Sequence, residues 1–194
     1  MTGISFPIAT HSRIASLFQR LIARIQPTPG EVSSARGHAA RIKTRIETSF
    51  NLKKSLIAGS FARQTYIRGC SDIDLFMLLS RDEARWGGGY VSSDTVLSNL
   101  KEELQRRFPT TDIHRDVHAI VVLFSSSGIS VDVVPAIFER MDLSMRPRYL
   151  MPDGSGWWMT TSPLTHNAYL AKANEKSVGK LRKTAQLIKY WRLC

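Results

Sequence analysis

Cysteine is scarce in this chain of 194 residues, which contains only Cys70 and Cys194. Two cysteines so far apart do not form the disulfide framework of a small secreted protein, and they favour a reducing compartment. The first residues lack the charged and then apolar pattern of a signal peptide, and no apolar run approaches the length that spans a membrane. These absences predict a cytoplasmic protein with no membrane partner.

Acidic residues are few as well: 16 Asp and Glu stand against 27 Lys and Arg, which gives a net charge of +11. Such an excess favours anionic partners such as nucleotides or nucleic acid. The basic residues are spread along the chain rather than gathered in a tail, so a charged face or cleft is expected rather than a disordered arm. The length predicts one domain with a sizeable core.

The stretch 56–79 holds two polar motifs, each next to an apolar run. Gly59 and Ser60 end the first run, where a glycine lets the backbone approach a ligand and a hydroxyl can hold phosphate oxygens. Asp72 and Asp74 precede the second run, which is short and fully apolar and therefore predicts a buried strand. Because side chains two apart on a strand share a face, the two carboxylates should lie side by side.

A third acid, Asp132, lies among β-branched apolar residues in the run 129–134. The segments 119–124 and 129–134, joined by the turn 125–128, predict a β-hairpin. An unpaired carboxylate on such a strand is costly, so Asp132 needs a partner. A hard divalent cation shared with Asp72 and Asp74 supplies one, since magnesium prefers oxygen ligands.

Helical periodicity predicts helices over 12–25, 32–50, 94–108 and 165–194, the last one interrupted near Gly179. In the last of these, the predicted buried stripe is Val178, Leu181, Ala185 and Ile188. The second helix is expected to pack behind the sheet, with a nucleic-acid-binding surface as the alternative.

Smaller features add little chemistry. Residues 87–89 are three glycines and predict a flexible loop, and no Lys-Ser or Lys-Thr follows to make it a phosphate loop. His114 and His118 lie in a predicted loop and strand with no third ligand at metal-site spacing, so zinc is not expected. Trp157 and Trp158 follow a turn and are expected to pack on a core edge rather than to stack on a base.

The order Gly-Ser, Asp-x-Asp and a distant Val-Asp-Val-Val-Pro resembles the nucleotidyltransferase superfamily that includes DNA polymerase beta. Within it, the chain is most similar to the cGAS/DncV-like nucleotidyltransferases, which are bacterial relatives of cyclic GMP-AMP synthase and oligoadenylate synthetase. The closer similarity rests on Arg63 and Thr65 before the acids and on the segments 151–153, 157–163 and 189–191. The resemblance covers about residues 56–191.

The resemblance implies an α/β (α+β) fold with a mixed sheet. Residues 1–53 would be N-terminal helices, 54–163 the catalytic palm and 164–194 the beginning of a C-terminal helical lobe. The chain ends within an apolar, aromatic helix that has no cap or stop signal, so it is expected to be a truncated protein that lacks the rest of that lobe.

The resemblance also implies an activity: synthesis of a cyclic di- or oligonucleotide from nucleoside triphosphates, used as a second messenger by bacteria against phage. Asp72, Asp74 and Asp132 would be catalytic and would bind two Mg²⁺ or Mn²⁺ ions, which assist phosphoryl transfer. Gly59, Ser60 and Lys189 would bind the nucleotide. An activating protein or nucleic acid would be a further partner.

Two other functions stay open. An RNA-tailing enzyme of the CCA-adding or poly(A) type carries the same three motifs, and segment 157–163 with the N-terminal helices favours the cyclic-nucleotide interpretation over it. A truncated chain can also be an inactive nucleotide-binding module, although the presence of all three acids argues against a primary loss of chemistry.

Overall fold

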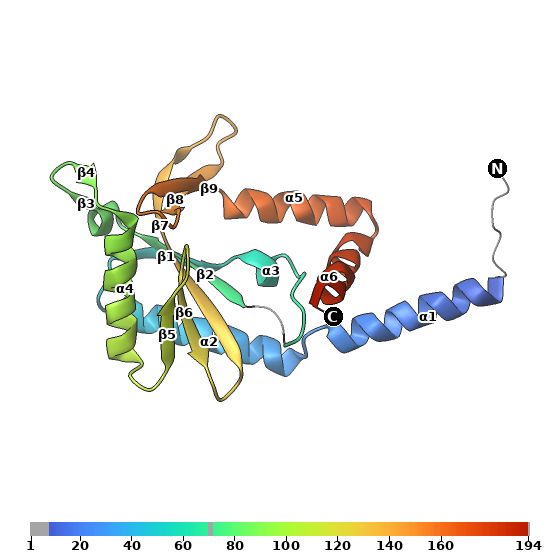
Figure 1. Cartoon of the computed structure of the whole chain (residues 1–194). Coiled ribbons are helices and arrows are strands. Elements are labelled where there is room, and N and C mark those ends of the chain that lie inside the picture. The colour runs from blue at the N-terminus through green and yellow to red at the C-terminus, as the bar shows by residue number, and fades with distance from the viewer. Residues whose placement is uncertain (1–7, 70–71, 194) are drawn as a thin grey trace.

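The computed structural model describes residues 8–69 and 72–193 (Figure 1). The helices are α1 (Ile8–Ile25), α2 (Pro29–Ile46), α3 (Gly59–Ala62), α4 (Ser93–Arg107), α5 (Pro163–Lys176) and α6 (Lys180–Leu193), with a 3₁₀ turn η1 (Arg81–Ala84). The strands are β1 (Leu52–Ile57), β2 (Ile73–Leu79), β3 (Arg85–Trp86), β4 (Gly89–Tyr90), β5 (Asp112–Arg115), β6 (Ile120–Phe124), β7 (Ile129–Met141), β8 (Pro147–Pro152) and β9 (Trp158–Thr161).

Seven strands of the described segments form one mixed sheet in the order β1-β2-β7-β6-β5, and β8 and β9 extend it from the second half of β7. The pair β2–β7 is parallel, whereas β1–β2 and β6–β7 are antiparallel. The predicted hairpin is therefore confirmed as β6 and β7, and the mixed sheet with flanking helices is the predicted fold class.

The central strand β7 is longer than the predicted run 129–134, because it continues through Pro135 to Met141. Proline normally ends a strand since it cannot donate a ladder hydrogen bond. Here one edge of β7 pairs with β6 as far as Val133 and with β8 only from Ile137, so Pro135 lies in the gap between the two partners. One strand can thus carry the site and also connect it to the β8–β9 ribbon.

Helices α2 and α4 cover one face of the sheet and form the main core with it. Ile42 of α2 and Leu97 and Leu100 of α4 are fully buried, and burial of each such side chain stabilises the fold by about 1.5–3 kcal/mol. The packing role predicted for the second helix is confirmed. Helix α2 ends before Phe50, which still packs against this core from the following loop.

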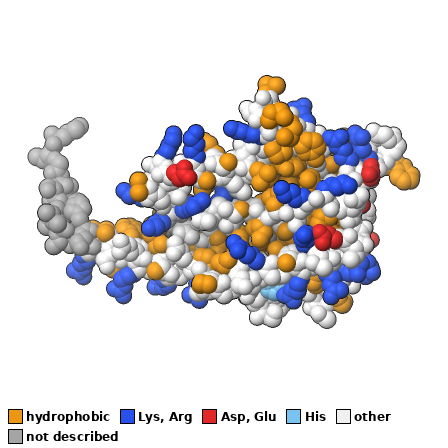
Figure 2. Space-filling model, turned by 180° about the vertical axis from the view of Figure 1, so that it is seen from behind, with side chains coloured by type: hydrophobic (Ala, Val, Ile, Leu, Met, Phe, Trp, Pro, Cys, Tyr) orange, Lys and Arg blue, Asp and Glu red, His pale blue; other side chains and the backbone are white. Residues whose placement is uncertain are grey.

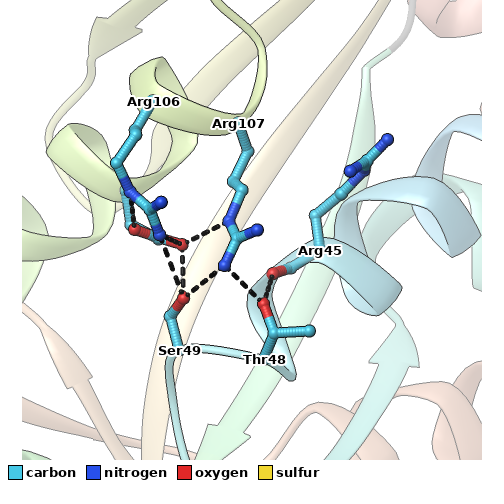
Figure 3. A network of polar contacts seen from close by, with 6 residues as sticks. Arg45, Thr48, Ser49, Arg106 and Arg107 are labelled. Atoms are coloured by element: carbon cyan, nitrogen blue, oxygen red, sulfur yellow. Dashed lines mark hydrogen bonds and ion pairs between the residues drawn. The ribbon is translucent and has the colours of Figure 1, made fainter.

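Figure 3 shows Arg106 and Arg107, at the end of α4, beside Thr48 and Ser49 in the connection between α2 and β1, and the acid that joins them is Glu103. Its carboxylate accepts hydrogen bonds from the Nε atoms of Arg106 and Arg107, at 2.8 and 2.7 Å, and one from the hydroxyl of Ser49. Arg107 also donates to Thr48 at 2.7 Å. Burial raises the pKa of Glu103, but these hydrogen bonds outweigh it and lower the pKa to about 2.

Helices α5 and α6 follow the β8–β9 ribbon, and Figure 1 shows α6 turning back toward α1. The predicted interruption near Gly179 is confirmed, because Val178 and Gly179 both have positive φ between the two helices. The predicted buried stripe is wrong in part, since Val178 is 85% exposed and Ile188 is 59% exposed. Gln186 is buried instead, and its amide donates to the carbonyl of Tyr66 at 2.9 Å.

Two predictions for loops change. Where a flexible loop was predicted over 87–89, Gly87 and Gly88 form the turn of a short hairpin, β3–β4, at the positive φ values that such turns require, and Gly89 begins β4. Trp158 packs on a core edge as predicted and donates its indole N–H to the carbonyl of Val91 at 2.8 Å. Trp157 does not pack, since it is 75% exposed.

In the described part of the chain, no helix combines the length and the hydrophobicity that crossing a membrane requires. Figure 2 shows Lys and Arg side chains spread over one face of the molecule, with few acidic side chains among them.

Candidate active site

The parallel pairing of β2 with β7 places Asp74 directly opposite Asp132. The neighbours of Asp74 on β2, Ile73 and Leu75, belong to the core covered by α2 and α4. Because strand side chains alternate, the two carboxylates extend from the opposite face of the sheet. Asp72 immediately precedes β2, two residues before Asp74, and lines a cleft together with Asp132.

Asp132 lies in an unfavourable place for a negative charge. Burial, together with the charges of Asp72, Asp74 and Asp116, raises its pKa to about 7. Its Oδ1 atom is buried and has no hydrogen-bond partner among the described residues. A buried carboxylate next to other carboxylates is stabilised by a cation, so this position suits a bound positive charge.

Gly59 makes room for Asp74. A Cβ atom at position 59 would lie 1.6 Å from Oδ2 of Asp74 and 2.3 Å from its Cγ, and Gly59 has φ of +55°. The Ala58 amide donates to the Asp74 carbonyl at 2.8 Å, and the Ser60 amide hydrogen-bonds to the carboxylate. Burial nevertheless raises the pKa of Asp74, with the positive charge of Arg63 opposing it. The Gly-Ser motif therefore lies beside the acids, as expected, and it also positions one of them.

Ser130 positions Asp72. It lies on β7 two residues before Asp132, and its hydroxyl donates a hydrogen bond to the Asp72 carboxylate. Ser130 was not among the site residues predicted from the sequence. The signal was available, because alternation along the strand places Ser130 on the same face as Asp132.

Lys189 of α6 lies near this group of acids. Burial and the positive charge of Arg63 lower its pKa, whereas the negative charge of Asp74 has the opposite effect. Arg63 follows α3 and also lines a large cleft, of about 1130 Å³, along α5. Two cations thus face the acids from the side of β1 and α3. Arg63 contributed to the family resemblance but was not among the predicted site residues.

A second cleft, of about 380 Å³, lies on the other side of the acids. His114 and Asp116 line its far wall, and Asp72 and Asp132 line the near one. From the sequence, His114 was considered only as a zinc ligand, and zinc was not expected. His118 does not line this cleft, and its Nδ1 lies 2.9 Å from the carbonyl oxygen of Pro152.

The three acids fit a hard divalent cation by their chemistry. Their donor atoms are all carboxylate oxygens, and the unpartnered Oδ1 of Asp132 is a free ligand atom. Over residues 8–69 and 72–193, no three acidic, histidine or cysteine side chains converge as a ready-made metal cluster. The Asp72 carboxylate instead accepts a hydrogen bond from the Ser130 hydroxyl. The ligand atoms are present, and the choice of ion stays a prediction.

The mixed sheet with three acids on one face has the architecture of a nucleotidyltransferase palm. Residues 13–174 match the family model of the Second Messenger Oligonucleotide or Dinucleotide Synthetase (SMODS) domain, and the chain belongs to this family. The expected membership of the cGAS/DncV-like nucleotidyltransferases is confirmed.

Two curated relatives are similar to this chain. One is named "Probable cyclic nucleotide synthase", from Bacillus cereus (strain VD146), and is 27% identical over 158 residues, covering 69% of this chain and 48% of the relative. The other is the cyclic AMP-AMP-AMP synthase of Escherichia coli (strain MS 115-1), 26% identical over 166 residues, covering 80% of this chain and 49% of the relative. The chain therefore spans about half the length of the curated relatives that it matches.

Among solved structures, the CdnC:HORMA-deltaN complex of E. coli MS115-1 has the same fold. Its TM-score is 0.68 at 22% sequence identity, and the match covers 93% of this chain and 56% of the other. At this identity the likeness concerns the fold alone, and it confirms the predicted mixed α/β architecture.

Proposed function

We propose that this chain carries the nucleotidyl-transfer site of an enzyme that joins nucleoside triphosphates into a cyclic di- or oligonucleotide. The observation that carries the proposal is the register of β2 and β7, which sets Asp74 beside Asp132, with Asp72 next to them. Three carboxylates on one sheet face, with cations at one side, are suited to transferring a nucleotidyl group from a triphosphate.

Asp72, Asp74 and Asp132 would hold Mg²⁺ or Mn²⁺. When bound, such ions stabilise the charge that develops on the entering and leaving oxygens of an in-line displacement at the α-phosphate. Asp132 also accepts the proton of the attacking hydroxyl, on the carboxylate oxygen that does not bind the ion. Lys189, with Arg63 next to it, neutralises the leaving pyrophosphate.

The Gly59-Ser60 motif has two roles in this proposal. Gly59 holds the space that the Asp74 carboxylate occupies, and the Ser60 amide hydrogen-bonds to that carboxylate. The Ser60 hydroxyl remains for the phosphate oxygens of the donor nucleotide.

The relatives support the class of product and substrate. One of them makes cyclic AMP-AMP-AMP, which favours ATP as one substrate of this chain. The solved complex with HORMA-deltaN favours an activating protein as a partner, and a role as a messenger in defence against phage agrees with the family membership. The match to the SMODS model favours cyclic products over RNA tailing, which uses the same three acids.

The test is incubation with four labelled nucleoside triphosphates and Mg²⁺ or Mn²⁺, followed by phosphatase treatment and mass analysis of resistant products. The control is the double variant Asp72→Asn/Asp74→Asn. We expect resistant cyclic products that the double variant does not make. Because the chain spans about half of its relatives, the assay includes a form extended by the second half of the E. coli synthase. Products that appear only when tRNA is added would support the tailing function instead.

A further inference from the structure

A single row of residues crosses four strands of the sheet at the candidate active site. Asp74 of β2 is opposite Asp132 of β7, Asp132 is opposite Val121 of β6, and Val121 is opposite His114 of β5. Directly opposite residues extend from the same face, and neighbouring strands lie about 4.8 Å apart. His114 therefore lies on the catalytic face, roughly 10 Å from Asp132.

The next row confirms that this part of the sheet is a continuous floor. Ser130 is opposite Leu123, and Leu123 is opposite Asp112 on β5. Val121 and Leu123 are half-buried and apolar, and they lie between the acids on one side and His114 and Asp116 on the other. The 380 Å³ cleft thus has an apolar floor and a polar wall at each end.

The two clefts lie on opposite sides of the acids. The cations Arg63 and Lys189 are on the side of β1 and α3, where the leaving pyrophosphate would be neutralised. In an in-line displacement, the attacking and leaving oxygens lie on opposite sides of the phosphorus. If the site performs the proposed reaction, the attacking hydroxyl therefore comes from the side of β6 and β5, which is the side of the smaller cleft.

The far wall of that cleft offers hydrogen-bond acceptors. The Asp112 carboxylate lies 3.6 Å from Nδ1 of His114, and a neutral imidazole keeps one ring nitrogen as a hydrogen-bond acceptor. Asp116 is a carboxylate that accepts the Val117 amide at 2.7 Å and has further acceptor capacity. Arg115 also lines the cleft, and its guanidinium forms an ion pair with Asp94, so its charge is already engaged.

We propose that this cleft binds the acceptor nucleotide, and that His114 and Asp116 select a base whose edge carries an amino group, as in adenine, guanine or cytosine. This inference rests on the proposed function. In the step concerned, a ribose hydroxyl oxygen of the acceptor forms a bond to the α-phosphorus of the donor. The bond from that phosphorus to the bridging oxygen breaks, pyrophosphate leaves with the electron pair, and the hydroxyl proton passes to Asp132.

A half-reaction separates the two nucleotide sites. The donor is 2′,3′-dideoxy-ATP, which has no hydroxyl to attack with, and the acceptor is α,β-methylene-ATP, whose α-phosphorus cannot release pyrophosphate. Together they form one phosphodiester bond. The KM of each nucleotide is measured with the other saturating, for the wild type, His114→Ala and Asp116→Asn, in the active form identified by the first experiment. The matched control is Asp142→Asn, because the Asp142 carboxylate also accepts backbone amides in a turn, outside the cleft.

The expected result is a rise of about tenfold in the KM of the acceptor for each cleft variant, since tenfold corresponds to the loss of one hydrogen bond of about 1.4 kcal/mol. The KM of the donor should stay within twofold, and Asp142→Asn should change neither. The wild type should prefer α,β-methylene-ATP to α,β-methylene-UTP as acceptor, and the variants should lose this preference.

An unchanged acceptor KM, an equal rise for the donor, or the same rise with Asp142→Asn would overturn the inference. A wild-type protein that joins no nucleotides overturns the proposed function together with it. If the wild type joins nucleotides and both cleft variants join them equally well, only the acceptor site is overturned.

Discussion

A methyl group at Gly59 would occupy the space of the Asp74 carboxylate. The Cβ atom of Gly59→Ala would lie 1.6 Å from Oδ2 and 2.3 Å from Cγ, far inside van der Waals contact. The Asp74 side chain must then move by more than 1 Å. It would also lose the alignment with the Ser60 amide and with Asp132 on the neighbouring strand.

Two costs follow from this change. Position 59 has φ of +55°, and an alanine there costs about 1–2 kcal/mol in backbone strain. Displacement of a reacting group by about 1 Å lowers a catalytic rate by about a hundredfold. The prediction is therefore a modest loss of stability together with a large loss of activity.

Gly128→Ala is the matched control, because Gly128 also has positive φ, +63°, but no atom lies within 4 Å of a Cβ placed there. Both variants should lose a similar amount of stability in a thermal melt. Only Gly59→Ala should lose nucleotidyl transfer, measured as pyrophosphate release in the active form of the enzyme. Retention of more than about half of the activity by Gly59→Ala, or an equal loss in Gly128→Ala, would refute the steric argument.

Three further variants test other contacts. Glu103→Gln should lower the free energy of unfolding by about 1–2 kcal/mol at neutral pH, after allowance for solvent screening. Because the folded-state pKa is about 2 against an ordinary 4.5, this stabilisation is present above pH 4.5 and is lost as the pH falls toward 2, so thermal melts of wild type and variant should converge there. Ser130→Ala should reduce turnover about tenfold with little change in KM, because Asp72 loses the hydroxyl that orients it, and a lower melting temperature with full turnover would contradict this. Asp132→Asn should raise the melting temperature by about 2–4 °C in EDTA, since it removes charge from a buried acidic group. The same variant should lose the stabilisation that Mg²⁺ gives the wild type. An equal response of both proteins to Mg²⁺ would argue against Asp132 as a ligand.

The parts of the fold that the sequence predicted are those with local patterns. The β6–β7 hairpin followed from two apolar runs around residues 125–128, and helix α4 followed from Leu97, Leu100 and Leu104 in helical register. The extension of β7 through Pro135 could not be predicted in this way. It depends on two different partner strands meeting along one edge, which is a property of the whole sheet.

The buried side of α6 was mispredicted for a related reason. Periodicity favoured Val178 and Ile188, but the structure buries Gln186. Its amide nitrogen donates to the Tyr66 carbonyl, and its side-chain oxygen accepts a hydrogen bond from the Gln26 amide at 3.4 Å. A buried amide is tolerated because its partners come from distant segments, and a pattern within one helix contains no information about them.

In the candidate site, too, some residues could be predicted from the sequence and others are brought in only by the fold. Asp72, Asp74 and Asp132 were selected because acids beside apolar runs are unusual, and the structure brings Asp74 and Asp132 into register. His114 and Asp116 were missed as cleft residues because nothing in segment 112–116 distinguishes them from surface residues. Their place near the acids follows from the pairing of β5 with β6, which only the fold defines.

The two faces of the sheet differ in how freely they can change during evolution. The face under α2 and α4 is closely packed, so substitutions there carry a cost in folding. His114 and Asp116 are exposed on the other side, where substitutions seldom affect stability. If the cleft selects the acceptor base as proposed, substitutions at His114 and Asp116 can change that choice while the scaffold that holds the three acids stays the same.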